Sequence, residues 1–265
     1  MSKIIRILLL CAALLVSMSP YAVAEEKSGH GHAVHWGYEG EGGPVHWGDL
    51  ASEYAVCKIG KNQSPINIEE GKVAPGAAVR AVKFDYKPTP LSILNNGHTI
   101  VLNYAPGSSV AVDGKKYELL QFHFHAPSEH TVAAKPYVME AHLVHKNAEG
   151  QLAVIGIFMV EGKENPFIAE IFKYMPEKAD EKKSDEHVMI DALKLLPDGY
   201  DHYFYTGSLT TPPCSEGVSW NVLKTPIEVS KAQVEKYVSV MGKNTARPAR
   251  EAGERKVTYS SPTVK

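Results

Sequence analysis

The middle of the 265-residue chain alternates short apolar or β-branched runs with turn residues. Asn-Gly, Pro-Gly and similar pairs separate the runs, a spacing that is typical of strands joined by turns. The runs that we expect to form strands cover residues 91–94, 99–104, 117–125, 137–145 and 152–160. Asn147 to Gly150 is placed to form a hairpin turn between the last two runs. The pattern therefore predicts that the centre of the chain is mostly sheet.

Helical patterns follow the predicted sheet. Residues 230–241 predict a helix with Ser230 as its N-cap and with one apolar face made of Val234, Tyr237, Val238 and Met241. Residues 188–195 predict a shorter helix, and residues 177–186 are polar enough for a solvated loop. Near the other end, residues 28–44 are rich in Gly and His and lack hydrophobic periodicity, so we expect an irregular arm laid over the body.

The composition is that of an ordinary globular protein, with 44% apolar and 22% charged residues. No internal repeat or domain boundary is visible, so one large domain over residues 25–265 is the simplest interpretation. The formal charge is −2, and it becomes −4 when Lys3 and Arg6 are removed with the first 24 residues. Nothing in this charge balance indicates nucleic-acid binding.

The first 24 residues have the pattern of a cleaved export signal. Lys3 and Arg6 precede an apolar run over residues 7–16, and Ala22-Val23-Ala24 supplies small residues at a cleavage site. A membrane anchor is the alternative, but a spanning helix needs roughly 20 apolar residues, and this run has about half that number. We therefore expect a periplasmic or secreted protein without a stable membrane anchor.

The cysteines fit the same destination. Cys11 lies inside the apolar run with further apolar residues after it, which disfavours attachment of a lipid there. Cys57 and Cys214 remain after cleavage, in a chain expected to reach a compartment where thiols are oxidised. Pairing is the favoured interpretation and two separate buried thiols are the alternative. A disulfide closing so long a loop stabilises the folded state by about 5 kcal/mol in the entropic description.

Three histidines have the spacing of a metal site. His123 and His125 are two residues apart, and on a strand this spacing sends both side chains to one face. His142 lies 17 residues further on, in the next predicted strand, where an antiparallel neighbour can present it beside the first two. Three imidazole nitrogens with one open position describe a catalytic zinc site better than a structural one.

Two polar residues are placed to orient these imidazoles. A histidine that binds a metal usually donates its other ring proton to a carboxylate or carbonyl oxygen. Gln121 and Glu140 each lie two residues before a proposed ligand, so Gln121 can support His123 and Glu140 can support His142. A lone His-x-His pair is more often a surface or core feature, but three histidines with two such partners favour a metal site.

Several segments together resemble the signature of the alpha-class carbonic anhydrases, in that family's order. They are residues 93–98 (ILNNGH), 121–125 (QFHFH), 128–130 (SEH), 140–145 (EAHLVH) and 208–213 (SLTTPP). The resemblance extends from His35 to Pro248, essentially the whole mature chain. It implies a mainly β protein with short helices, in which a single domain surrounds a large, twisted, mostly antiparallel central sheet and zinc lies at the bottom of a conical cavity.

The resemblance also implies the reaction and its catalytic residues. Zn²⁺ on His123, His125 and His142 would provide hydroxide near neutral pH, for which carbonic anhydrase is the standard example, and hydroxide would convert carbon dioxide to bicarbonate. Thr210 is similar to the threonine that accepts a hydrogen bond from this hydroxide and donates one to a buried carboxylate, here Glu129. From the sequence alone, Thr210 would be a turn residue and Glu129 a loop acid.

The small apolar substrate needs hydrocarbon beside the metal. The side chains that match the family's pocket are Val144, Val154, Leu209 and Trp220, each of which is equally consistent with ordinary core packing. Thr211 adjoins the site and is expected to contact bicarbonate or water.

Turnover also requires export of a proton by a group that titrates near neutrality. His98 is similar to the family's proton shuttle, and a plain turn histidine is the alternative. Tyr38 and Asn96 match residues that order the connecting waters. Val101 departs from the family pattern, because the best-known members have a polar residue there, so the detailed proton path is expected to differ.

Other departures point to the compact exported bacterial forms. Ala126 replaces a bulky aromatic residue of many animal relatives, and the connection to Ser128 is shorter. A second metal site on the arm, from His30, His32 and His35, is disfavoured, because flexible His-rich tails commonly lack one.

Two other functions are consistent with such a scaffold. One is a noncatalytic zinc-binding or ligand-recognition protein, against which the complete set of three histidines argues. The other is a metal-dependent esterase, which would need a wider pocket. The expected assembly is a monomer or a homodimer, and no motif decides between them.

Overall fold

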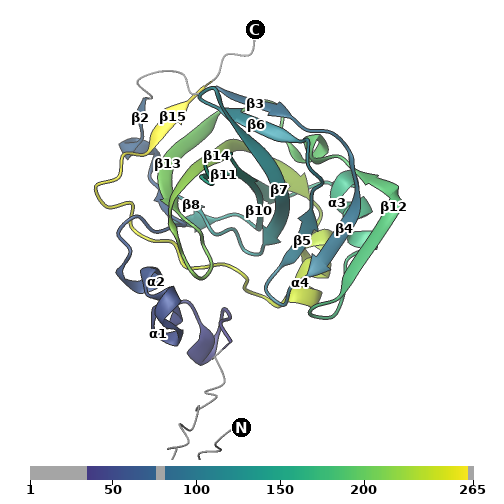
Figure 1. The fold of residues 1–265 in the computed structure, drawn as a ribbon, viewed down its shortest axis with the longest axis horizontal. Helices are drawn as coiled ribbons and strands as arrows, with labels where there is room; N and C mark the ends of the chain where they lie inside the picture. Colours follow the sequence, from purple (N-terminus) through teal and green to yellow (C-terminus); the bar gives the residue numbers. More distant parts are fainter. Residues whose placement is uncertain (1–34, 76–80, 262–265) are drawn as a thin grey trace, which may run out of the picture. The chain divides into compact units, whose positions relative to one another are not determined.

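The computed structural model describes residues 35–75 and 81–261, and in these ranges β-strands predominate over short helices (Figure 1). The strands are β1 (Asn67–Ile68), β2 (Ala74–Pro75), β3 (Val82–Asp85), β4 (Thr89–Asn95), β5 (Ile100–Asn103), β6 (Ser109–Val112), β7 (Lys115–His125), β8 (Thr131–Val132), β9 (Lys135–Pro136), β10 (Met139–Lys146), β11 (Leu152–Glu161), β12 (Lys182–Ile190), β13 (His202–Ser208), β14 (Glu216–Val229) and β15 (Thr258–Ser260). The α-helices are α1 (Trp47–Leu50), α2 (Val56–Ile59), α3 (Pro166–Lys173) and α4 (Lys231–Met241), and the 3₁₀ turns are η1 (Gly40–Gly42), η2 (Ser52–Tyr54), η3 (Glu70–Lys72) and η4 (Ala192–Leu195). The predicted export signal, Cys11, His30 and His32 lie outside the described residues.

One large mixed sheet organises these strands. Its order is β12-β4-β5-β7-β10-β11-β14-β13-β15-β2, with β6 joining β7 to β3, and a small second sheet contains β1, β8 and β9. Most pairs in the large sheet are antiparallel, while β11 with β14 and β15 with β2 are parallel. The mainly β architecture with a large, mostly antiparallel sheet is therefore confirmed.

The five predicted strands correspond to β4, β5, β7, β10 and β11, and the predicted hairpin turn joins the last two. In that turn, the Asn147 N–H donates to the Gln151 carbonyl at 3.0 Å. The predicted helix is also present as α4. Ser230 caps it with a reciprocal capping box to Gln233, and Tyr237 is fully buried on its inner face.

Two predictions around β12 are wrong. Residues 182–190 form an edge strand paired with β4, so the expected loop over 177–186 holds only for residues 177–181. The expected helix over 188–195 is limited to the 3₁₀ turn η4 at its end. The charged residues of β12 suit a strand at the edge of a sheet, where charge discourages pairing with another chain. The helix α3 was not predicted, although Asn165 as N-cap and Pro166 at the first helical position are its sequence signals.

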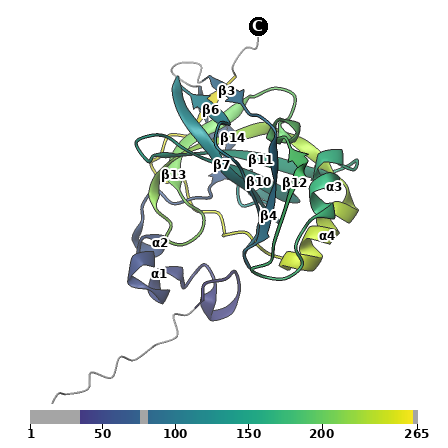
Figure 2. The same cartoon turned by 45° about the vertical axis from the view of Figure 1, so that its right-hand side comes forward.

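The strands of the sheet centre are buried on both faces and divide their side chains between two clusters. On β11, Ile155 and Ile157 belong to the apolar core that includes side chains of α3 and α4, whereas Val154 and Phe158 belong to a separate cluster with Trp220. Figure 2 shows α3 and α4 together on one side of the sheet. Because side chains alternate along a strand, Gln121, His123 and His125 face away from the core shared with the helices. This face carries the candidate site.

A third apolar cluster fixes the N-terminal segment to the body. Trp47 is fully buried in it, and its indole N–H donates to the carbonyls of Gly37 and Gly42. Cys57 and Cys214 form a disulfide in the same cluster, with their Cα atoms 5.0 Å apart, which confirms the predicted pairing. Within residues 35–75 and 81–261, no helix is long and apolar enough to cross a membrane.

Candidate metal centre

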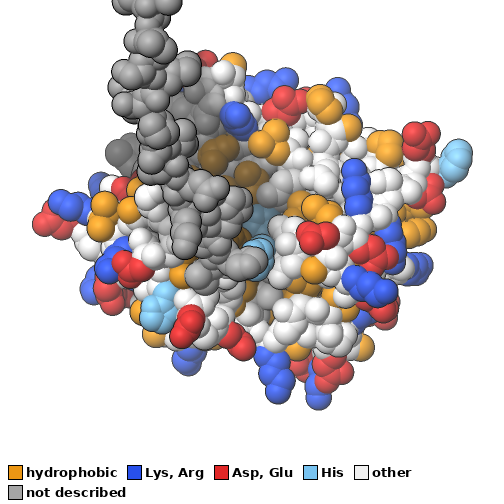
Figure 3. Space-filling view, turned by 60° about the horizontal axis from the view of Figure 1, so that its bottom comes forward, with side chains coloured by type: hydrophobic (Ala, Val, Ile, Leu, Met, Phe, Trp, Pro, Cys, Tyr) orange, Lys and Arg blue, Asp and Glu red, His pale blue; other side chains and the backbone are white. Residues whose placement is uncertain are grey.

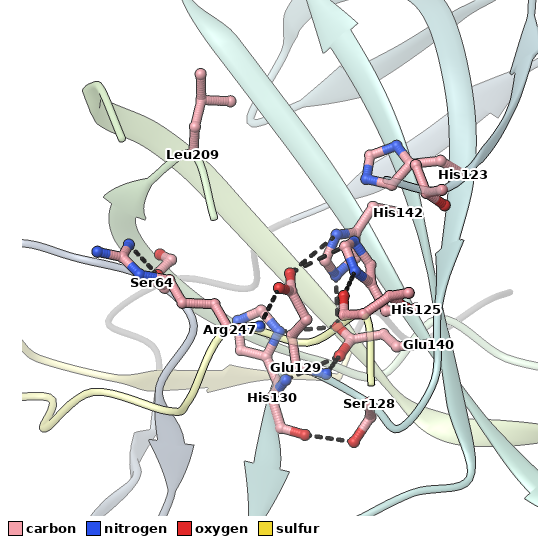
Figure 4. A network of polar contacts seen from close by, with 12 residues as sticks. Ser64, His123, His125, Ser128, Glu129, His130, Glu140, His142, Leu209 and Arg247 are labelled. Atoms are coloured by element: carbon pink, nitrogen blue, oxygen red, sulfur yellow. Dashed lines mark hydrogen bonds and ion pairs between the residues drawn. The ribbon is translucent and has the colours of Figure 1, made fainter. Parts of the chain in front are cut away.

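The three predicted histidines come together at the centre of the large sheet. His123 on β7 and His142 on β10 are direct partners across the antiparallel pair, and His125 follows on the same face of β7. One nitrogen from each ring lies within 4.8 Å of the other two, which is close enough for all three to bind one metal ion. Figure 4 shows these rings beside Glu129 and Glu140. His125 and His142 are buried, and His123 is partly exposed.

Each imidazole is held through one ring nitrogen. His123 Nδ1 lies 2.9 Å from Gln121 Oε1, and His142 Nε2 lies 2.9 Å from Glu140 Oε1, as the sequence predicts. His125 Nδ1 lies 2.6 Å from the carbonyl of Thr245, a partner that the sequence did not reveal. The nitrogens left over are His123 Nε2, His125 Nε2 and His142 Nδ1, and the buried His125 Nε2 has no hydrogen-bond partner. This donor set fits a zinc ion.

Burial and charge set the protonation of the rings. Burial, followed by repulsion between the rings, lowers the pKa of His123 well below its ordinary value, and burial also lowers the pKa of His125. For His142, burial acts in the same direction, but the Glu140 carboxylate outweighs it and raises the pKa. Neutral imidazoles are the form that binds metal, so His123 and His125 are prepared for this role without a proton to release.

Glu140 is the centre of a buried hydrogen-bond network that extends beyond the prediction. Its Oε1 contacts both His142 Nε2 and, at 2.8 Å, His130 Nδ1. Its Oε2 accepts the backbone N–H groups of Glu129 and His130, each at 2.9 Å. Burial alone would raise the pKa of Glu140, but the charges of His130 and His142 and the hydrogen bonds from their side chains hold it well below its ordinary value. Two histidines thus share one ionised carboxylate oxygen.

His130 continues this network to the neighbouring segment. Its Nε2 lies 2.6 Å from the Tyr205 hydroxyl, which donates to Ser64 Oγ at 2.8 Å. Spacing along the sequence does not support His130 as a ligand, and the structure shows it as a fully buried partner of Glu140. The position of His130 directly after Glu129 places it near the site, but its contact with Glu140 becomes visible only in the folded structure.

Gly156 leaves room for the Glu140 carboxylate. It lies opposite His142 on β11, and a Cβ atom there would meet Glu140 Oε1 at 2.9 Å. The next nearest atoms are Val222 methyls at 3.4 and 3.5 Å. A side chain at this position would therefore press first on the carboxylate that orients His142.

Glu129 lies between the histidines and a buried arginine. Its Oε1 accepts the backbone N–H of Arg247 at 2.8 Å. Its Oε2 has no hydrogen-bond partner and lies 3.5 Å from His125 Nε2 and 3.8 Å from His142 Nδ1. The expected hydrogen bond from Thr210 is not formed, because this oxygen is turned toward the imidazole nitrogens; Thr210 itself is buried.

Arg247 is a buried cation without an acidic partner among the described side chains. Its guanidinium donates to Gln63 Oε1 (2.9 Å), to the Ser64 carbonyl (2.8 Å) and to the Cys57 carbonyl (3.0 Å). Burial lowers its pKa to about 10, so it remains charged at neutral pH. Figure 4 shows it reaching from the Glu129 side toward Ser64. No periodicity in the sequence identified this residue.

The predicted pocket residues form one row beside the histidines. Val144, Val154 and Trp220 are successive partners across β10, β11 and β14. Leu209 packs partly buried against the same cluster, and the Trp220 ring centroid lies 4.8 Å from that of His142. Figure 3 shows apolar and histidine surface together in a hollow of this face. Thr211, next to Thr210, is partly exposed.

His98 lies in the turn between β4 and β5, half-buried against aromatic residues. Its ring stacks on Trp36, with centroids 3.5 Å apart, and on His35, at 4.9 Å. Burial, followed by the charge of His35, lowers the pKa of His98 to about 4, whereas the resemblance led us to expect a group titrating near neutrality. The low pKa of His98 follows from its stacked position, which buries half of the ring and places it beside His35.

Tyr38 and Asn96 have protein roles that the sequence did not indicate. Asn96 Oδ1 accepts the backbone N–H groups of His98 and Thr99, so it shapes the turn that carries His98. The Tyr38 ring packs against Trp36 and Trp47. Its buried hydroxyl has no hydrogen-bond partner, and burial, with the nearby Glu129 charge, raises its pKa well above the ordinary value.

Known proteins match both the sequence and this structure. A sequence profile of eukaryotic-type carbonic anhydrases matches residues 42–261. The chain is 41% identical over 249 residues to a carbonic anhydrase of Neisseria gonorrhoeae, covering 94% of this chain and 95% of that protein. It is 42% identical over 226 residues to one of Nostoc sp., covering 84% and 85%. The solved alpha-carbonic anhydrase of Thermovibrio ammonificans, in complex with sulfanilamide, is 49% identical with a TM-score of 0.82, covering 84% of this chain and 98% of that one.

Proposed function

The chain belongs to the alpha carbonic anhydrase family and catalyses the reversible hydration of carbon dioxide, and from this premise we propose that His123, His125 and His142 hold its zinc ion. One observation carries this assignment: each imidazole is fixed through one nitrogen, and the three remaining nitrogens lie within reach of a common ion. When bound, zinc supplies the Lewis acidity that makes a water-derived nucleophile available near neutral pH, for which carbonic anhydrase is the standard example.

The protein's contribution to the metal site is orientation. Gln121 and Glu140 accept from His123 and His142, and the Thr245 carbonyl accepts from His125. These hydrogen bonds fix which nitrogen of each ring is free, and the carboxylate of Glu140 increases the electron density that His142 offers.

Thr210 and Glu129 orient the attacking oxygen. Glu129 Oε2 is a buried acceptor without a hydrogen-bond partner. We assign the Thr210 hydroxyl as the group that donates a hydrogen bond to it in the working enzyme. With its proton committed to Glu129, the Thr210 oxygen can only accept from the nucleophile, which directs a lone pair toward the substrate. Thr211 contacts bicarbonate or water beside it.

Carbon dioxide binds on the apolar side of the site. Val144, Val154, Leu209 and Trp220 offer hydrocarbon next to His142, and carbon dioxide has no strong hydrogen-bonding group to satisfy. The product bicarbonate is charged, so the same apolar surface favours its departure.

The released proton leaves through the mouth of the site. We assign His98 as the shuttle, in a turn held by Asn96, and the unpartnered Tyr38 hydroxyl as a group that orders water along the path. Val101 is the direct strand partner of His123, so an apolar side chain borders this path.

We also propose that residues 1–24 direct export and are removed, and that residues 25–265 work as one catalytic domain in the periplasm or outside the cell. The charged and apolar pattern of the first 24 residues and the disulfide Cys57–Cys214 support this location. N-terminal sequencing of protein recovered outside the cytoplasm tests it: a start near Glu25 agrees, and an uncleaved start contradicts it.

Cobalt substitution tests the ligand assignment without relying on activity. An all-imidazole site accepts Co²⁺, whose visible absorption is intense in tetrahedral geometry. We expect one Co²⁺ per chain with this spectrum, lost in His125→Ala and retained in a matched control, His187→Ala, whose side chain is exposed. An unchanged spectrum in His125→Ala would contradict the assignment.

A further inference from the structure

Thr245 makes three hydrogen bonds at the end of the strand β7. Its carbonyl accepts from His125 Nδ1 at 2.6 Å. Its backbone N–H donates to the Ala126 carbonyl at 2.9 Å, and its Oγ1 accepts the Ala126 N–H at 3.0 Å. Thr245 and Ala126 are both buried. One residue of the irregular segment after α4 therefore contacts both a proposed zinc ligand and the residue that follows this ligand in the chain.

The side chain of Thr245 does what a backbone carbonyl usually does. Two facing residues of an antiparallel pair commonly exchange both hydrogen bonds through their main chains, each N–H donating to the other residue's carbonyl. Thr245 and Ala126 make only one of these two bonds in that way, and the Ala126 N–H donates to the Thr245 hydroxyl instead. The Thr245 carbonyl is thereby available to accept from His125.

Tyr237 on α4 orients this hydroxyl. The Tyr237 hydroxyl donates its single proton to the Phe124 carbonyl at 2.6 Å, and its oxygen lies 3.4 Å from Thr245 Oγ1. Because that proton is already committed, the Tyr237 oxygen can only accept from Thr245. The proton of the Thr245 hydroxyl then points toward Tyr237, and the lone pairs of Oγ1 are left to accept the Ala126 N–H.

We propose that Thr245 is a positioning residue of the metal site, whose hydroxyl pairs with the Ala126 N–H so that its carbonyl stays committed to His125. The inference rests on the proposed zinc site, because it concerns how His125 is held there. Without the hydroxyl, the buried Ala126 N–H loses its partner, and the cost of an unpaired N–H favours a shift that offers it the Thr245 carbonyl. Such a shift weakens the bond that fixes the His125 ring. Residue 245 lies outside all the segments that carry the resemblance to the family.

Competition with a chelator on wild type, Thr245→Val, Thr245→Ser and Thr89→Val tests this role through the zinc dissociation constant. Valine keeps the shape of threonine without the hydroxyl, whereas serine keeps the hydroxyl. Thr89 is the matched control, because its buried Oγ1 also accepts a backbone N–H, that of Ala105 at 3.1 Å, but in β4 next to the edge strand β12. We expect the dissociation constant to rise about tenfold or more in Thr245→Val and to stay within about threefold of wild type in Thr245→Ser and Thr89→Val.

The NMR resonance of the His125 ring N–H in zinc-loaded protein adds a readout that is independent of activity. A short hydrogen bond to the Thr245 carbonyl moves this resonance downfield, so we expect an upfield shift in Thr245→Val, recovery in Thr245→Ser and no shift in Thr89→Val. A merely structural role would lower stability and leave the resonance in place. Thr245→Ala, which also lacks the hydroxyl, gives the same comparison should the valine variant not fold.

The outcomes separate this inference from the proposed function. Wild-type zinc affinity with an unmoved resonance in Thr245→Val would overturn the role of the hydroxyl and leave the three-histidine site intact. An equal loss of affinity in Thr245→Ser would overturn it as well, because the hydroxyl is still present there. A wild-type protein that binds no zinc would instead remove the proposed site, and the role of Thr245 with it.

Discussion

Gly156→Ala is expected to weaken zinc binding through the Glu140 carboxylate. The added methyl would stand 2.9 Å from Glu140 Oε1, inside ordinary van der Waals contact, whereas the Val222 methyls lie at 3.4 and 3.5 Å and tolerate it. The backbone belongs to β11, paired with both β10 and β14, so it cannot easily move away. The carboxylate must retreat instead.

The size of the effect follows from the hydrogen bonds of that oxygen. Relief of the contact requires a shift of about 0.5 Å, which is enough to carry a bond near 2.9 Å past the usual upper limit of about 3.2 Å. Oε1 holds both His142 and His130 at such distances. Loss of a hydrogen-bond partner behind a metal ligand typically lowers metal affinity about 10- to 100-fold, and we expect Gly156→Ala to fall in this range.

Competition with a chelator measures the zinc dissociation constant, and a double-mutant cycle with Glu140→Ala identifies the cause. Without the carboxylate the methyl meets no obstacle, so Gly156→Ala should cost little in that background. Gly71→Ala, where no atom lies within 4 Å of the new Cβ, is the matched control. Wild-type affinity in Gly156→Ala, or an equal loss in both backgrounds, would refute the reasoning.

Three further predictions concern stability and rate. Burial lowers the pKa of His145 to about 3. Below about pH 6.5 this imidazole therefore binds a proton in the unfolded chain but stays neutral in the folded chain. The stability that this group contributes is therefore complete above pH 6.5 and falls by about 2 kcal/mol by pH 5. His145→Gln retains an acceptor for the Tyr86 hydroxyl and should not show this loss. Denaturant titrations at pH 7.5 and pH 5 measure the difference. Replacing Cys57 and Cys214 by Ser should lower the free energy of unfolding by about 5 kcal/mol, and a loss below about 1 kcal/mol would contradict the loop-closure argument. Thr210→Val should lower kcat/KM about 100-fold at full zinc content while Thr210→Ser remains near wild type, and equal rates would remove Thr210 from the mechanism.

Local patterns predicted the core of the site because its key spacings are properties of single strands. His123 and His125 share a face by alternation, and Gln121 and Glu140 reach their histidines two residues away along the same strand. The resemblance to the family added Thr210, Glu129 and the pocket residues. From the alternation of side chains alone, these residues would be ordinary turn, loop or core residues.

Contacts between distant segments were not predictable in this way. The Thr245 carbonyl behind His125 and the Arg247 N–H behind Glu129 come from an irregular C-terminal segment, separated from their partners by more than a hundred residues. The pattern of residues 182–190 does not predict the strand β12, because an edge position permits charge and the strand has no continuous buried face. The space at Gly156 exists only once β10 and β11 are paired.

The most direct test of the central claim is stopped-flow hydration of carbon dioxide by purified protein and by His142→Ala, with the zinc content of each determined on the same samples. We predict one zinc per chain and fast hydration in the wild type, with both lost in His142→Ala and both retained in His187→Ala. A His142→Ala protein that hydrates carbon dioxide as fast as wild type, or a zinc-loaded wild type no faster than buffer, would contradict the account.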